Sequence, residues 1–343
     1  MTIKKLIADA AETHHRVELR RRDDRIASLS SEVKELTERL DRAARRTALR
    51  NCLAGAPELR PRQRTAGGKR EAVAVVMVSD LHLEETILSG AVNGLNSFDL
   101  AAADRRMLRL ADAIAWEISL ERHAFEINQM VLWLGGDIIT GEIHEDLLAS
   151  NGLGLSKAVR FARQQLIRLI RSVLALDVDL TVVCNDGNHG RLDKRQRVAT
   201  RVDNSMEAVL YDSIAEAFEP EKKARFVLPE GILTYQKILS TMVRFTHGDA
   251  VKYLGGVGGI LIPINKAVAQ WDKSIHADHT IMGHWHQRLT TRRVSVNGSL
   301  PGYGAYSLWI KAEPEPPQQG LLLIDSKRGV CHPKDLWVAE RGK

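Results

Sequence analysis

Cysteine is scarce in this sequence. Only Cys52, Cys184 and Cys331 occur among 343 residues, and their spacing matches no zinc-binding pair. Three scattered cysteines also cannot form the dense disulfide framework that small secreted proteins use. We therefore expect a protein of the reducing cytoplasm.

Long apolar runs are missing as well. No stretch of eighteen or more apolar residues occurs, so we expect no membrane-spanning helix and no membrane partner. The first sixteen residues, MTIKKLIADAAETHHR, contain only a short apolar stretch, which Asp9 and Glu12 interrupt. This pattern is unlike a secretory signal. The 44% of hydrophobic residues is nevertheless enough for a substantial core.

Positive charge is unevenly distributed along the chain. The formal net charge is +6. Residues 1–70 carry 18 Lys and Arg against 10 Asp and Glu, whereas residues 71–343 carry 31 against 33. An excess confined to one segment indicates an anionic partner, most simply nucleic acid. A solubilising arm is the alternative.

Residues 1–45 have the pattern of a helical coiled-coil segment. Apolar side chains follow one another at alternating steps of three and four residues: Ile26, Leu29, Val33, Leu36, Leu40 and Ala43. These steps form an a/d heptad seam, and polar residues surround it. We expect the helix to form a homodimer. The alternative is an amphipathic helix that packs on its own domain.

Residues 46–70 have a different composition. Pro and Gly recur in them, and from residue 45 onward Glu58 is the only acid among eight bases: Arg45, Arg46, Arg50, Arg60, Arg62, Arg64, Lys69 and Arg70. We interpret this segment as a flexible basic linker. Release of counterions would let it bind a polyphosphate backbone without reading its sequence.

Residues 71–343 have an alternating α/β pattern. The strand-like runs are residues 71–80, 129–137, 178–189, 242–249 and 279–286. Helical stretches lie between them, at residues 101–120, 157–176 and 204–218. Every strand-like run ends in a polar cluster, and in open α/β sheets ligands bind outside the carboxyl ends of the strands. We therefore expect one α/β domain with a site at these ends.

The five polar clusters share a residue chemistry. In chain order they are Asp-x-His (80–82), Gly-Gly-Asp (135–137), Gly-Asn-His (187–189), His-Gly (247–248) and Gly-His-x-His (283–286). Each cluster alone has the composition of an ordinary turn. Packing gives no reason to place carboxylates and imidazoles at five successive strand ends, whereas a metal site does.

This ordered set resembles the signature of the calcineurin-like metallophosphoesterase superfamily, over roughly residues 74–290. The resemblance implies a four-layer α/β/β/α sandwich, here with an N-terminal helical extension. Within the superfamily the chain looks closest to the DNA-processing nucleases and to related phage or bacterial phosphoesterases. It departs from the family pattern at Gly190, where Asp or Glu is frequent, and at Asp249, where the nucleases often have His.

The resemblance also implies two divalent metal ions and their ligands. Asp80, His82 and His286 would hold one ion, Asn188, His247 and His284 the other, and Asp137 would bridge both. Mixed imidazole and carboxylate ligands suit Mn²⁺, Fe or Zn²⁺ better than Mg²⁺ or Ca²⁺, and we expect Mn²⁺. In an extended strand, His284 and His286 would point to the same face.

Two further features concern the phosphate. His189 follows the ligand Asn188, and in the family this histidine contacts the phosphate and protonates the leaving oxygen, a task that suits an imidazole. A structural histidine is the alternative. Five basic residues come directly after it, and we expect them to bind phosphate or nucleic acid: Arg191, Lys194, Arg195, Arg197 and Arg201.

Together these features predict a binuclear-metal-dependent phosphoesterase. We expect it to hydrolyse phosphodiester bonds, most simply in DNA, because two ions can neutralise the phosphodiester and generate hydroxide near neutral pH. A phosphatase or phosphodiesterase of small nucleotides is the first alternative. A non-catalytic binding scaffold is the second, and the retention of all seven ligand positions argues against it.

Overall fold

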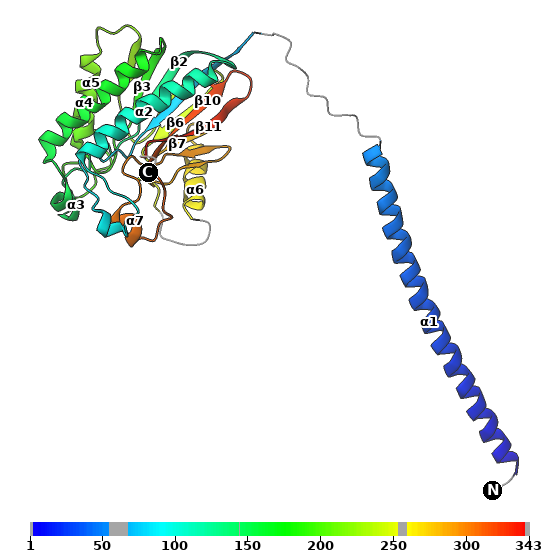
Figure 1. Ribbon diagram of the computed structural model, residues 1–343. Coiled ribbons are helices and arrows are strands. Elements are labelled where there is room, and N and C mark those ends of the chain that lie inside the picture. The colour runs from blue at the N-terminus through cyan, green and yellow to red at the C-terminus, as the bar shows by residue number, and fades with distance from the viewer. Residues whose placement is uncertain (1–2, 55–67, 144, 253–258, 340–343) are drawn as a thin grey trace. The chain divides into compact units, whose positions relative to one another are not determined.

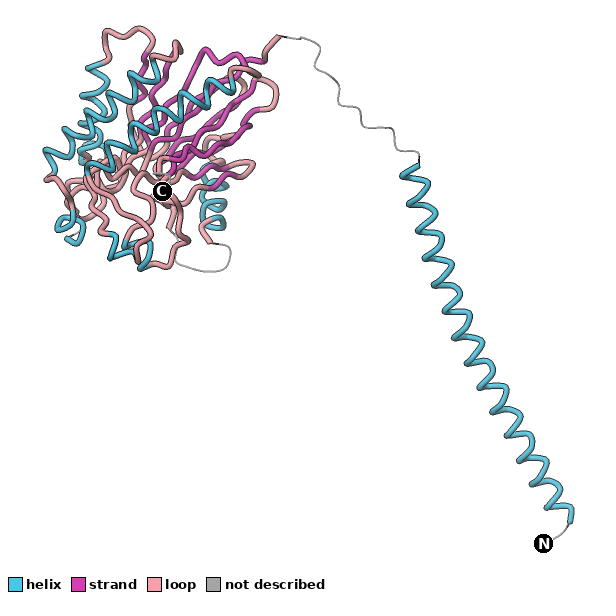
Figure 2. The backbone as a smooth tube through the Cα atoms, viewed as in Figure 1, coloured by secondary structure: helices cyan, strands magenta, loops and turns pink. Residues whose placement is uncertain are grey.

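The computed structural model describes residues 3–54, 68–143, 145–252 and 259–339 (Figures 1 and 2). The chain divides into two compact units, Met1–Gly67 and Gly68–Lys343. Most of the expected basic linker, residues 55–67 with Arg60, Arg62 and Arg64, lies outside the described residues. Within the described part of the chain, no helix has both the length and the apolar character needed to cross a bilayer.

The described part of the first unit is one helix, α1 (Ile3–Ala54). The helix continues past residue 45 because residues 46–54 (RTALRNCLA) contain neither Gly nor Pro and are mostly good helix formers. The apolar seam is exposed: its five large side chains, Ile26, Leu29, Val33, Leu36 and Leu40, are between 48% and 71% accessible. Pairing of this seam with another helix stays a prediction.

The second unit contains a six-stranded sheet and a five-stranded sheet. The larger sheet consists, in spatial order, of β11 (Gly329–Trp337), β10 (Gln318–Asp325), β1 (Arg70–Val78), β2 (Phe125–Leu134), β3 (Asp179–Cys184) and β4 (Ala224–Val227). Strands β1 to β4 run parallel, so their carboxyl ends meet at one edge. Strands β10 and β11 are antiparallel additions to the β1 side.

The smaller sheet consists, in spatial order, of β5 (Thr234–Ile238), β6 (Thr241–Thr246), β7 (His279–Met282), β9 (Val294–Val296) and β8 (Leu289–Thr290). Strands β6, β7 and β9 run parallel, and β5 and β8 pair antiparallel at the two edges. The parallel β6–β7 pair brings the ends of two ligand-bearing strands together, as the β1–β3 group does in the larger sheet.

The alternation of side chains along β1 explains how the layers stack. Val73, Val75 and Met77 pack against residues of the smaller sheet such as Phe245. Their neighbours Ala74, Val76 and Val78 face the opposite way and pack with three helices: α2 (Leu100–Glu121), α4 (Leu155–Leu174) and α5 (Met206–Ala217). Strand β1 is therefore buried on both faces, as a central parallel strand is.

A fourth layer covers the other face of the smaller sheet. Ile264 and Val268 of α6 (Leu261–Trp271) pack with Met282, Val294 and Val296. The order is helices, sheet, sheet, helix, which confirms the expected α/β/β/α sandwich (Figure 1). The remaining short helices are η1 (Ser89–Val92), α3 (Glu145–Ser150), η2 (Val202–Asn204) and α7 (Ala305–Trp309).

Candidate metal centre

Five loops at the carboxyl ends of parallel strands carry the candidate ligands. Asp80 and His82 follow β1, Asp137 follows β2, Asn188 follows β3, His247 follows β6, and His284 and His286 follow β7. Backbone hydrogen bonds tie these loops together. Asp80 N donates to Gly136 O at 2.9 Å, and Gly283 N donates to His247 O at 2.8 Å. These two bonds join loops within each sheet, and the N–H of His284, which donates to the Asp80 carboxylate at 3.0 Å, joins the loops of the two sheets.

The backbone at the candidate ligands is unusual. Five of them adopt left-handed conformations, with φ of 53° at Asp80, 40° at His82, 50° at Asp137, 72° at His284 and 53° at His286. Such conformations disfavour residues with a β-carbon, persist only where the surroundings enforce them, and cluster at functional sites. The expectation that His284 and His286 share the face of an extended strand is wrong, because β7 ends at Met282 and both residues lie in the loop that follows.

One group of potential ligands consists of Asp80, His82 and His286, with one ligand atom from each within 4.8 Å of the others. The Nε2 atoms of His82 and His286 are 3.2 Å apart, and His286 Nε2 is 3.4 Å from Asp80 Oδ1. The Asp80 carboxylate also accepts the backbone N–H of His284. Its orientation is therefore fixed by the loop that carries the two histidines.

A second group consists of Asp137, His247 and His284. His247 Nε2 lies 3.0 Å from Asp137 Oδ2 and 3.2 Å from Asn188 Oδ1. The other ring nitrogen of His247 lies 2.8 Å from the carbonyl oxygen of Gly135, which can only accept a hydrogen bond, so Nδ1 carries the proton and Nε2 points to the group.

The two groups are contiguous. Asp137 and His82 belong to a third set with His189, again within 4.8 Å. Asp137 therefore lies between the two groups, at the position that the resemblance assigns to a bridging carboxylate. The structure brings all seven expected ligands into one site: Asp80, His82, Asp137 and His247 are buried, and Asn188, His284 and His286 are partly exposed.

The protonation states fit a cation site. Burial lowers the pKa of His284 to about 4 and that of His82 well below its usual value, so both imidazoles are neutral, the form that binds metal. Burial also lowers the pKa of His247, but Asp137, Asp80 and Asp249 outweigh this effect and raise it to about 10. The carboxylates thus attract positive charge that a metal ion can supply. The buried Nδ1 of His82 has no hydrogen-bond partner among the described residues.

His189 lies at the edge of the second and third groups. Its backbone N–H donates to Asp137 Oδ1 at 2.9 Å, and its Nδ1 lies 3.0 Å from the carbonyl oxygen of Thr140. That carbonyl fixes the tautomer with the proton on Nδ1 and turns Nε2 into the nitrogen that can exchange a proton with a substrate. The ring also contacts His82 edge-on, with centroids 4.9 Å apart.

The basic residues after His189 are largely engaged within the protein. Arg191 donates to the backbone carbonyls of Asn188, Asp193 and Lys194. Lys194 pairs with Glu145, and Arg197 pairs with Asp193. These two ion pairs join exposed side chains and contribute little stability, so Lys194 and Arg197 can exchange them for a phosphate. Arg195 is exposed.

Arg201, also expected to contact phosphate, is buried in ion pairs. Its side chain is only 8% exposed and donates to Asp186 at 2.7 Å and to Asp249 at 2.7 Å. Asp249 thus holds Arg201 near His247. Because Arg201 also pairs with Asp186, it links the loop that follows β3 to the loop that follows β6.

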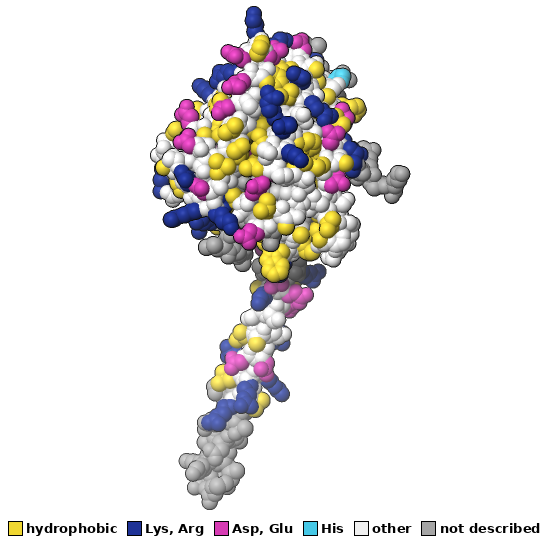
Figure 3. All heavy atoms as spheres, turned by 90° about the vertical axis from the view of Figure 1, so that its left-hand side faces the viewer, with side chains coloured by type: hydrophobic (Ala, Val, Ile, Leu, Met, Phe, Trp, Pro, Cys, Tyr) yellow, Lys and Arg dark blue, Asp and Glu magenta, His cyan; other side chains and the backbone are white. Residues whose placement is uncertain are grey.

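On the face shown in Figure 3, Lys and Arg side chains are interspersed with acidic and hydrophobic ones, so the atoms described there form no patch of a single sign. The basic residues of α4 lie among such neighbours; Arg168, for example, pairs with Asp104.

Two buried carboxylates beside the ligands have no signal in the sequence. Glu84 accepts the backbone N–H groups of Thr140 and Gly141 at 2.8 and 2.9 Å, and burial raises its pKa to about 7. Glu207, in the first turn of α5, accepts backbone N–H groups from two ligand loops. Neither residue stands in a motif, and only the folded backbone brings its N–H partners within reach.

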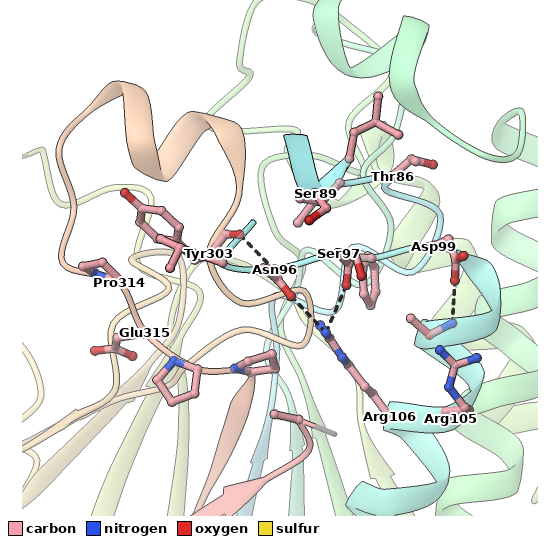
Figure 4. A pocket seen from close by; sticks show the side chains of 18 residues that line it. Thr86, Ser89, Asn96, Ser97, Asp99, Arg105, Arg106, Tyr303, Pro314 and Glu315 are labelled. Carbon is pink, nitrogen blue, oxygen red and sulfur yellow. Dashed lines mark hydrogen bonds between the residues drawn. The ribbon is translucent and has the colours of Figure 1, made fainter. Parts of the chain in front are cut away.

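A cavity of about 600 Å³ lies beside the chain that follows Asp80 and His82 (Figure 4). Arg106 reaches from α2 into its wall and donates to Asn96 Oδ1 and to the backbone carbonyls of Ser97, Leu300 and Pro301. Because the N–H of Leu300 in turn donates to Asp80 O at 3.0 Å, the cavity wall is connected to the ligand loop.

No protein-family model and no curated protein matches the chain. Among solved structures, Vps29 complexed with Zn²⁺ from Entamoeba histolytica is 12% identical, with 77% of this chain and 99% of that chain covered and a TM-score of 0.31. A conserved, predicted phosphoesterase from Streptococcus pneumoniae is 11% identical, covering 79% and 98%, with a TM-score of 0.27. The sulfate thiohydrolase SoxB from Thermus thermophilus is 10% identical, covering 80% and 58%, with a TM-score of 0.35.

Likeness at these identities and scores carries no argument about the activity of the present chain. What the structure itself defines is an α/β/β/α sandwich whose strand ends converge on a cluster of histidines and carboxylates suited to metal binding.

Proposed function

We propose that the chain is a phosphoesterase that uses two divalent ions, with Mn²⁺ as the first ion to test. The observation that carries the proposal is the convergence of seven ligand-type side chains from five strand ends, five of them in left-handed backbone conformations. When bound, two such ions neutralise a phosphodiester, lower the pKa of water and orient an in-line displacement. A site of mixed imidazole and carboxylate ligands suits ions that perform this phosphodiester hydrolysis.

The side chains of the chain have distinct tasks in this proposal. Asp137 lies between the two ligand groups and holds the backbone of His189. The carbonyl of Thr140 holds the Nδ1 proton of His189. When Nε2 is protonated as well, it can deliver that second proton to the leaving oxygen, and the ring is left as the neutral Nδ1–H tautomer.

We propose a nucleic acid, most simply DNA, as the substrate. Two aromatic side chains of α7 support this choice: Tyr306 is 74% exposed and Trp309 is 81% exposed. A third aromatic residue, Tyr303, lies two residues before the start of α7 and lines the cavity beside the ligand loop (Figure 4). Exposed aromatic rings next to a phosphodiester site can stack with unpaired bases, and such stacking contributes about 1–3 kcal/mol per base.

The aromatic pair gives a testable expectation. In the double variant Tyr306→Ala/Trp309→Ala we expect the KM for single-stranded DNA to rise at least about tenfold, because two stacking contacts are lost. Hydrolysis of bis(p-nitrophenyl) phosphate should change much less, since this small ester carries no nucleobase to stack. Exposed Trp116 on α2 provides the matched control Trp116→Ala. An unchanged KM for DNA in the double variant would show that the aromatic side chains of α7 do not bind the substrate.

The substrate class is tested by a panel assay of the purified protein with Mn²⁺. The substrates are bis(p-nitrophenyl) phosphate, single-stranded DNA, duplex DNA and cyclic nucleotides. Cleavage of DNA supports a nuclease. Turnover of cyclic nucleotides alone would favour the small-nucleotide alternative, and a protein that binds Mn²⁺ but turns over none of these would favour a binding scaffold.

We also propose that α1 pairs with a second copy of the chain. The β-branched residues Ile26 and Val33 occupy a positions of the seam, and Leu29 and Leu36 occupy d positions. This combination favours a parallel two-stranded coiled coil. All four side chains are exposed in the single chain, and pairing would bury them.

Removal of residues 1–67 should change assembly more than chemistry. We expect the mass measured by light scattering to fall from dimer to monomer, and the affinity for DNA to depend less steeply on salt, because fewer counterions are released. Activity on bis(p-nitrophenyl) phosphate should survive, because every candidate ligand lies after residue 79.

Within the full chain, Leu36→Asp should disrupt the dimer, whereas Ser31→Asp, outside the seam, should not. A truncated protein that remains dimeric would refute the pairing of α1.

A further inference from the structure

The loops that carry Asp137 and Asn188 both turn sharply at the end of the larger sheet, and their backbone N–H groups point into the protein. Buried N–H groups need acceptors, since leaving one unsatisfied costs about 1–3 kcal/mol. At this point the acceptor is a single side chain, Glu207, which is fully buried in the first turn of α5.

The carboxylate of Glu207 binds both loops at once. Oε1 accepts the N–H of Ile138 at 2.6 Å and that of Ile139 at 3.4 Å. Oε2 accepts the N–H of Gly187 at 2.7 Å and that of Asp137 at 3.3 Å. Because Oε2 joins one loop to the other, its position sets the separation between Asp137 and the residue that follows Gly187, which is Asn188.

The route by which this carboxylate enters the site depends on a glycine. A β-carbon placed on Gly190 would lie 2.6 Å from Cγ of Glu207 and 3.1 Å from its Cδ, so any side chain at position 190 would collide with Glu207. The carbonyl of Gly190 accepts the N–H of Met206 at 2.8 Å, which fixes the start of α5 against this loop. The absence of a side chain at residue 190 thus makes the room that Glu207 fills.

We propose that Glu207 is the positioning residue of the metal centre: it fixes the bridging carboxylate Asp137 and the ligand Asn188 at the separation that two ions require. Glu207 does so through the backbone of both loops and is itself no ligand. The inference rests on the proposed two-metal function and names the residue that holds its geometry.

Variants of Glu207 test this role by metal binding. Glu207→Gln keeps the shape of the side chain but places an NH₂ group against either Ile138 and Ile139 or Gly187 and Asp137, where donors would face donors. We expect the affinity of the purified apoprotein for Mn²⁺, measured by calorimetry, to fall about 10–100-fold. The kcat for bis(p-nitrophenyl) phosphate should fall with little change in KM. Glu121→Gln is the control, because Glu121 is a buried carboxylate of α2 that pairs with Lys334 and His332 instead.

A relocated carboxylate separates positioning from general stability. Gly190 does not have a left-handed backbone, so an aspartate can be placed there. Glu207→Ala removes the side chain that such an aspartate would meet. We expect Glu207→Ala to bind Mn²⁺ at least about tenfold more weakly than the wild type, and Gly190→Asp/Glu207→Ala to recover most of the loss.

The outcomes distinguish this proposal from the function on which it rests. Wild-type protein that binds no Mn²⁺, Zn²⁺ or Fe²⁺ overturns the two-metal function itself. Wild-type protein that binds Mn²⁺, together with Glu207→Gln of equal affinity, overturns the role of Glu207 alone. If Glu207→Ala does not fold, Glu207→Gln and the double variant still decide, and unaltered Mn²⁺ affinity in the Gln variant is the contrary result.

Discussion

Replacement of Asp137 by alanine is expected to abolish hydrolysis of a phosphodiester while leaving the protein folded. The carboxylate lies between both ligand groups, 3.0 Å from His247 Nε2, and accepts the backbone N–H of His189 at 2.9 Å. Its loss removes the proposed bridge between two ions. A metal ion contributes several kcal/mol of charge stabilisation in the transition state, so a decrease of at least about 10³-fold in kcat is expected. His284→Ala should have a similar effect through the second group.

The measurement is turnover of bis(p-nitrophenyl) phosphate with Mn²⁺ in excess, with circular dichroism to establish folding. Asp179→Ala and His276→Ala are matched controls, because both residues are exposed and outside the ligand groups. Near-normal turnover by folded Asp137→Ala or His284→Ala would exclude the assignment of these ligands.

Replacement of His189 by alanine should give the second largest loss. We expect both metal sites to bind as before while turnover slows by a factor of about 10²–10⁴, the range for loss of a general acid. The geometry supports this task, because the Thr140 carbonyl holds Nδ1–H, so the doubly protonated ring gives up its other proton, at Nε2, and ends as the neutral Nδ1–H tautomer.

The leaving group decides between proton transfer and simple contact with the phosphate. Nitrophenolate leaves without needing a proton, whereas the alkoxide of a deoxyribose does. The loss in His189→Ala should therefore be smaller for a nitrophenyl ester than for DNA. Equal losses on both substrates would show that His189 only positions the phosphate, and weaker Mn²⁺ binding would make it a further metal ligand.

The ligand loops of this protein and the strands before them can be predicted from its sequence, whereas the four layers were expected from the resemblance to the metallophosphoesterase superfamily. Apolar runs that end in a polar cluster locate β1, β2, β3, β6 and β7, because a buried parallel strand is apolar throughout and its carboxyl end is the place where a ligand can reach the backbone. The helices α2, α4 and α5 lie within two residues of the expected stretches.

The backbone of the site could not be predicted in the same way. The spacing of His284 and His286 indicated an extended strand, yet both have positive φ in a loop. Asp and His tolerate this conformation better than most residues, but sequence does not reveal where surrounding contacts enforce it.

Buried charge networks were equally hidden. Arg201 belongs to a run of basic residues that predicts a phosphate-binding surface. In the folded protein its side chain is buried against Asp186 and Asp249, two carboxylates from other parts of the chain. In the sequence, Glu207 is one acidic residue of a predicted helix. Only the structure shows that its carboxylate accepts hydrogen bonds from four backbone N–H groups. Contacts between residues distant in sequence decide both roles.

The central claim is that the seven clustered side chains hold two divalent ions. Calorimetric titration of metal-free protein with Mn²⁺ tests it most directly, because it counts ions without requiring the substrate. We predict two ions bound per chain in the wild type, and loss of at least one of them in His284→Ala with no change in the His276→Ala control. A wild-type protein that binds no Mn²⁺, Zn²⁺ or Fe²⁺, or that binds Mn²⁺ equally well after both Asp137→Ala and His284→Ala, would contradict the account.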